Sequence, residues 1–143
     1  MDAERISRTI YTGTKKFTQQ DIRTANATGF GAAADDYAER GIDLNEQLIR
    51  NKPATFFFRM SGDAMIESGI YDRDILVVDR SLNAASGKVV IAAYNGELIV
   101  RRLEKTINKI RLLPDNRKLS PLEVQHDQEF AIWGVVTYNI HAV

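Results

Sequence analysis

Few side chains in this sequence are of the types that usually perform catalysis or bind metals. The chain has no cysteine, which excludes disulfides and thiolate metal sites. Its two histidines, His126 and His141, show no metal-ligand spacing, so we expect neither a metal nor a cofactor. The richest basic stretch, residues 101–111, is interrupted by apolar residues at nearly every second position. That pattern is typical of a strand with one solvated face rather than of a nucleic-acid site.

The composition is that of a globular protein of one domain. The 143 residues are 44% hydrophobic and 27% charged. Because 19 basic residues balance 19 acidic ones, no overall attraction to nucleic acid or to an anionic membrane is expected. Residues 1–17 do not resemble a signal peptide, and no apolar run approaches the roughly 20 residues needed to cross a bilayer. We expect a cytoplasmic protein without membrane contact or sequence-specific DNA binding.

The sequence divides into a polar N-terminal part and a domain that would position a functional site. Residues 1–34 are polar and end in a run of small residues, which predicts a flexible N-terminal arm. A domain is expected over residues 35–143. Asp43, with Glu46 three residues later, is typical of the start of a short helix that ends before Pro53.

Seven strand-like segments follow, rich in β-branched and aromatic residues and separated by turn signals. They cover residues 54–60, 74–79, 88–94, 97–103, 109–114, 122–125 and 130–140. Asn95-Gly96 between two of them predicts a type I′ hairpin turn, because both central residues of that turn need positive φ. The expected fold is a mostly β, compact antiparallel domain with one short helix and the N-terminal arm.

Several blocks of the sequence resemble the LexA/UmuD family of self-cleaving serine peptidases. Residues 59–66 are similar to the Ser-Gly-Asp-Ser-Met block of that family, whose last serine is the nucleophile; the matching residues are Ser61, Gly62, Asp63 and Met65. Residues 68–79 resemble the stretch that follows it, and residues 96–103 match the strand that carries the general-base lysine. Residues 28–45 look like the UmuD branch in particular, and residues 130–136 resemble the closing strand of the family.

The resemblance places Ala64 at the nucleophile position and Arg101 at the general-base position, with the family's spacing of 37 residues between 64 and 101. A Ser/Lys dyad works because a desolvated lysine can lose its proton and then take one from the serine hydroxyl. Alanine has no oxygen with which to attack. An arginine side chain stays protonated and cannot act as the base. The chain is therefore predicted to be catalytically inactive.

Two readings of these substitutions stay open at this point: a naturally degenerate relative, or changes introduced to keep the chain intact. Rescue by a neighbouring residue is not expected. Ser61 lies three residues before the nucleophile position, and Ser68 lies four residues after it. Lys105 lies four strand residues beyond Arg101, which is roughly 13 Å and outside hydrogen-bond reach. These residues are read as turn and surface positions.

The resemblance also implies a substrate and a function. The scissile bond of a UmuD-type arm maps to Thr28-Gly29, although a flexible linker would have the same composition. The expected function is that of a UmuD-like SOS-response protein: a homodimer, stimulated to cleave itself by a RecA filament on single-stranded DNA, that serves a UmuC-type error-prone polymerase. The alternatives are the peptidase domain of a LexA- or phage-type repressor, a membrane-bound signal peptidase, which the missing transmembrane segment argues against, and a non-catalytic interaction module.

Overall fold

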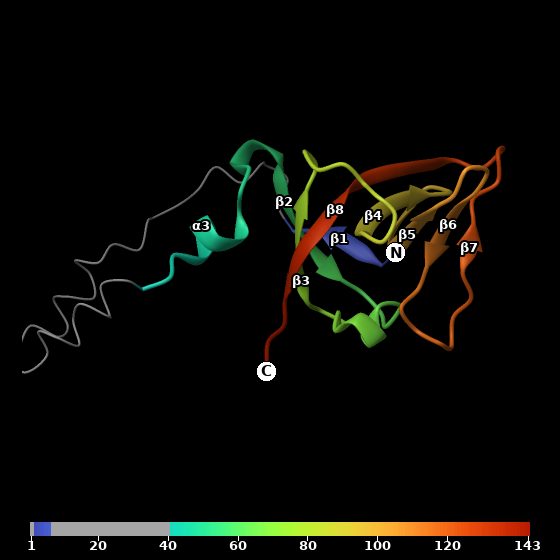
Figure 1. The fold of residues 1–143 in the computed structure, drawn as a ribbon. Coiled ribbons are helices and arrows are strands. Elements are labelled where there is room, and N and C mark those ends of the chain that lie inside the picture. Colours follow the sequence, from blue (N-terminus) through green and yellow to red (C-terminus); the bar gives the residue numbers. More distant parts are fainter. Residues whose placement is uncertain (1, 7–40) are drawn as a thin grey trace, which may run out of the picture. The chain divides into compact units, whose positions relative to one another are not determined.

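A computed structural model of the chain describes residues 2–6 and 41–143. Within it, residues 2–6 and 51–143 belong to one compact unit, and residues 41–50 belong to a second. The first unit holds an antiparallel sheet, and the second holds one short α-helix, α3 (Leu44–Leu48) (Figure 1). The mostly β fold with one short helix is thus confirmed for the described residues.

The eight strands of the sheet are all antiparallel to their neighbours, in the order β1-β2-β3-β8-β4-β5-β6-β7. Their bounds are β1 (Ala3–Arg5), β2 (Thr55–Met60), β3 (Ile75–Asp79), β4 (Val89–Tyr94), β5 (Glu97–Lys105), β6 (Ile110–Leu113), β7 (Leu122–Glu123) and β8 (Phe130–Ile140). Two 3₁₀ turns precede and follow β2, η2 (Lys52–Ala54) and η3 (Ile66–Ser68).

Strands β2 to β8 are the seven segments that the sequence predicts, each within two residues of its expected bounds. The predicted hairpin joins β4 to β5, with φ of 48° at Asn95 and 81° at Gly96. Helix α3 also begins as expected, because a side-chain oxygen of Asp43 accepts from the backbone N–H of Asn45 at 3.0 Å.

Strand β1 was not predicted. The sequence indicates a flexible arm over residues 1–34, yet Ala3 pairs with Met60 and Arg5 with Phe58 along the edge of β2. Residues 3–5 therefore form a strand that the sequence did not indicate. The rest of the expected arm, including Thr28 and Gly29, lies outside the described residues, and its boundary with the domain stays a prediction.

The sheet curls, so that its first strand reaches its sixth. Strands β1 and β5 are separated by four strands in the order of the sheet, but the two are in contact. The backbone N–H of Asp2 donates to the carbonyl of Leu98 on β5 at 2.9 Å. Figure 1 shows strand β1 in blue.

Both faces of the central strands are packed, which explains their nearly continuous apolar sequences. Neighbouring residues alternate between two apolar clusters: Val90 and Ile99 belong to one, and Ile91 and Val100 belong to the other. The Ile91 cluster also contains alternate side chains of β2 and β3, among them Phe58 and Leu76, and the buried residues Ala64 and Met65 that follow β2. The curl of the sheet thus brings β1, β2 and β5 around one core.

Asp74 fastens the turn before β3 to the last residues of the chain. Its side chain is buried and accepts from the backbone N–H of Tyr71 at 2.9 Å and from the amide of Asn139 at 2.8 Å, while His141 Nδ1 lies at 2.6 Å. Burial alone would raise the pKa of Asp74. The hydrogen bonds from Tyr71, His141 and Asn139, with the positive charge that His141 can carry, outweigh burial and leave the pKa of Asp74 below its usual value.

This depressed pKa gives a stability contribution with a definite pH dependence. Because the folded-state pKa is below the unfolded value of about 4, the contribution is present above pH 4 and is lost as the pH falls through the folded-state pKa. Asp74→Asn is expected to lower the free energy of unfolding by about 1–3 kcal/mol at pH 7, and by less under acid conditions. Urea unfolding at pH 7 and under acid conditions gives the free energy of unfolding of Asp74→Asn and of the exposed control Asp127→Asn. The loss relative to the unchanged chain is then compared between the two conditions. An equal loss at both pH values would contradict this role for the Asp74 carboxylate.

Candidate active site

The block that resembles the family motif leaves the end of β2 in a tight turn. Gly62 has φ of 91°, a conformation that residues with a side chain rarely adopt, and its N–H donates to Asp72 Oδ1 at 2.8 Å. The chain then turns inward, so that Ala64 and Met65 are both buried in the core with Val100. The η3 turn follows directly. The residue at position 64 is therefore held where the sheet core meets the surface.

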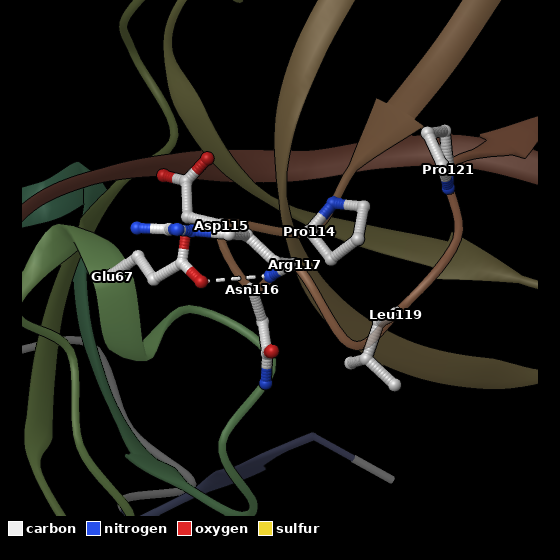
Figure 2. Close-up of a pocket in the computed structure, with 7 residues that line it drawn as sticks. All are labelled: Glu67, Pro114, Asp115, Asn116, Arg117, Leu119 and Pro121. Atoms are coloured by element: carbon white, nitrogen blue, oxygen red, sulfur yellow. Dashed lines mark hydrogen bonds and ion pairs between the residues drawn. The ribbon is translucent and has the colours of Figure 1, made fainter.

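A loop from the far side of the sheet supports this turn (Figure 2). The side-chain amide of Asn116 donates to the carbonyl of Asp63 at 2.9 Å, immediately before position 64. The backbone N–H of Glu67 donates to the carbonyl of Asp115 at 2.8 Å, and the N–H of Arg117 donates to Glu67 Oε2 at 2.8 Å. Figure 2 shows this last bond at one side of a surface pocket of about 440 Å³. The loop thus fixes both ends of the turn, although no local sequence pattern marks it.

Strand β5 carries Arg101, whose side chain reaches the N-terminal residue Asp2. Its side chain is only 12% exposed, and Nη1 donates to its neighbour's carbonyl, Val100 O, at 2.8 Å. Nη1 also forms an ion pair with the carboxylate of Asp2. Nε is buried and, within the described part of the chain, has no hydrogen-bond partner.

Asp2 is the residue that joins the two halves of the site. Its N–H donates to Leu98 O on β5, and its carbonyl accepts from the N–H of Ser61 at 2.6 Å. Its side chain meets Arg101. The segments that carry positions 64 and 101, far apart in the sequence, therefore lie on either side of one residue. Nothing in the sequence pattern around Asp2 indicated this role.

Neither of the two dyad positions carries a group that can take up a proton near neutral pH. Ala64 offers no nucleophile, and the guanidinium of Arg101 is held as a cation by a carboxylate. The hydroxyl of Ser68 donates to Met65 O at 2.9 Å, and Lys105 lies at the exposed end of β5. What the site does contain is an edge of β2 that pairs with strand β1, and the cation of Arg101, which pairs with the carboxylate of Asp2.

The described residues contain neither a metal-binding cluster nor a membrane-spanning helix. Among them, no group of three or more His, Cys, Asp or Glu side chains is placed to hold a metal ion. No helix within residues 2–6 and 41–143 is long and apolar enough to span a membrane.

Comparison with known proteins identifies the family. The model of the peptidase S24-like family matches residues 22–137. The chain belongs to this family. Protein SamA of Salmonella typhimurium is 42% identical to this S24-like chain over 113 residues, which are 79% of the chain and 78% of SamA. Protein MucA of Escherichia coli is 37% identical over 115 residues, 80% of the chain and 78% of MucA.

A LexA protein is also among the relatives, with less of its length covered. LexA repressor 1 of Xanthomonas oryzae pv. oryzae is 39% identical over 109 residues, which are 76% of this S24-like chain and 54% of the repressor. Taken with SamA and MucA, this pattern makes the chain a UmuD-type member of the S24-like family, as the sequence blocks indicated.

Proposed function

We propose that this chain is a UmuD-like protein of SOS mutagenesis, held in a form that cannot cleave itself. The observation that carries the proposal is the state of the dyad positions within an S24-like chain: Ala64 has no hydroxyl, and Arg101 is paired with Asp2. A UmuD-type arm would be cut between Thr28 and Gly29. With the dyad silent, the arm stays attached and the chain acts through binding alone.

The partners follow from the same proposal. The chain forms a homodimer in the cytoplasm, meets the RecA filament on single-stranded DNA, and associates with a UmuC-type translesion polymerase. Because the uncleaved form keeps these surfaces, it restrains mutagenesis instead of enabling it. Restraint of this kind requires only that the chain compete with a cleavable relative for a place in the dimer and for binding to the polymerase.

A second candidate is a non-catalytic interaction module that has left the SOS pathway. One observation favours it: the site already holds a strand of its own chain, so it is arranged for binding. This candidate predicts the same fold but no effect on mutagenesis.

Mutation frequency after DNA damage separates the two functions. In cells that contain a UmuC-type polymerase but no UmuD-type protein, the chain is expected to leave the frequency at its background. The double revertant Ala64→Ser with Arg101→Lys is expected to raise it. In cells with a cleavable UmuD-type protein, an excess of the chain is expected to lower the frequency. If neither protein changes the frequency in either strain, the SOS assignment is wrong and the interaction module remains.

A further inference from the structure

The N-terminal residues occupy the candidate site as an added strand. Residues 3–5 extend the sheet along β2, and the hydrogen bonds continue at both ends of the strand. At one end Ser61 N donates to Asp2 O at 2.6 Å, and at the other Ile6 N donates to Phe57 O at 2.9 Å. The backbone that an extended peptide would need at this edge is therefore already paired, because such peptides bind chiefly through main-chain hydrogen bonds.

The side chains of this strand divide between the core and the solvent. Ala3 is wholly buried in the apolar cluster that includes Ala64 and Met60. Glu4, next along the strand, is exposed. The guanidinium of Arg5 lies over the ring of Phe56 at 4.6 Å. The position of Ala3 accepts a small side chain, because the cluster closes around it.

Asp2 and Arg101 depend on each other for charge balance. The guanidinium of Arg101 is mostly buried, and a buried cation is costly without an anion beside it. Asp2 supplies that anion from the strand that closes the site. If the strand leaves, Arg101 loses its counterion, so the ion pair links occupancy of the site to the residue at the general-base position.

We propose that residues 2–6 are the resident occupant of this peptide-binding edge, latched by the ion pair between Asp2 and Arg101. The edge accepts an extended segment through backbone hydrogen bonds, and its own N-terminus excludes other segments from it. One of the excluded segments is the one around Thr28 and Gly29; this last step rests on the proposed function, whereas the latch does not. In this arrangement Arg101 does not act as a base; it binds an anion.

Amide hydrogen exchange in the full chain tests the latch directly. The N–H of Ser61 is the reporter, because its acceptor is the backbone carbonyl of residue 2, which every substitution keeps. Asp2→Ala is expected to speed exchange at Ser61 by about tenfold or more. Glu4→Ala removes the same charge from the same strand but does not touch Arg101, so exchange at Ser61 stays unchanged. Exchange at Ile91 and Val100 is the check that the core of each variant is folded.

A labelled peptide with the sequence of residues 22–34 then tests the exclusion. It is expected to bind Asp2→Ala and not the chain itself or Glu4→Ala. If Ser61 stays protected in Asp2→Ala, the latch is wrong. If Ser61 loses protection and the peptide still does not bind, the latch stands, and the entry of the arm into this site, which the proposed function requires, is wrong.

Discussion

The double revertant Ala64→Ser with Arg101→Lys is expected to cleave its own chain, whereas the chain as it stands stays intact. The reason is that both parts of the dyad are needed for the attack. The hydroxyl must lose its proton to a neighbouring base as it forms the bond, and a lysine in a partly desolvated position can supply that base. The turn and the strand that position these two residues are otherwise complete, with Asn116 holding the carbonyl before position 64.

The single revertants are the matched controls. Ala64→Ser alone has the nucleophile but keeps a permanent cation at position 101, and loss of a general base costs about 10² to 10⁴ in rate. Arg101→Lys alone has a base and no oxygen. The fraction of full-length chain over time on a denaturing gel, at alkaline pH where more of the introduced lysine is neutral, measures all four proteins. Equal cleavage by Ala64→Ser and the double revertant would show that position 101 does not carry the base.

Removing the carboxylate of Asp2 from the double revertant is expected to speed its self-cleavage by about tenfold or more near neutral pH. Two effects act in the same direction. An opposite charge beside a lysine raises the pKa of its amine, which leaves less of the neutral base. In addition, the N-terminal strand that Asp2 holds at β2 occupies the edge that the arm would approach under the proposed function.

The pH profile separates these two effects. If the charge of Asp2 dominates, the gain from Asp2→Ala disappears at high pH, where the lysine is neutral with or without the carboxylate. If occupancy dominates, the gain persists at every pH. Glu4→Ala in the same background is the control for loss of one acidic residue from β1, and no change is expected. A rate that Asp2→Ala leaves unchanged at every pH would contradict any influence of Asp2 on the dyad positions.

The sheet could be predicted from the sequence because its signals are local. Strands β2 to β8 are short apolar runs bounded by turn residues, and Asn95-Gly96 requires a backbone that few other pairs adopt easily. Positions 64 and 101 were found through resemblance and not through pattern. Alanine and arginine carry no sign of a dyad by themselves.

The rest of the site depends on contacts between distant residues, which no local pattern encodes. Strand β1 has three residues and lies in a polar stretch, too short for any period to appear. Asp2 and Arg101 are 99 residues apart, and Asn116 is 53 residues from Asp63. The sequence around His141 likewise gives no sign of its partner, because that partner is the buried carboxylate of Asp74, 67 residues away. Tertiary structure alone brings these pairs together.

The central claim is that positions 64 and 101 form the dyad site of a UmuD-type chain whose substrate is its own arm. Intact mass of the double revertant after incubation at alkaline pH, beside the chain as it stands, tests it most directly, because mass locates the cut as well as detecting it. The predicted result is two products from the revertant alone, residues 1–28 and 29–143. One intact mass for both proteins, with RecA filaments and nucleotide also present, would contradict the claim, as would a cut at any other bond.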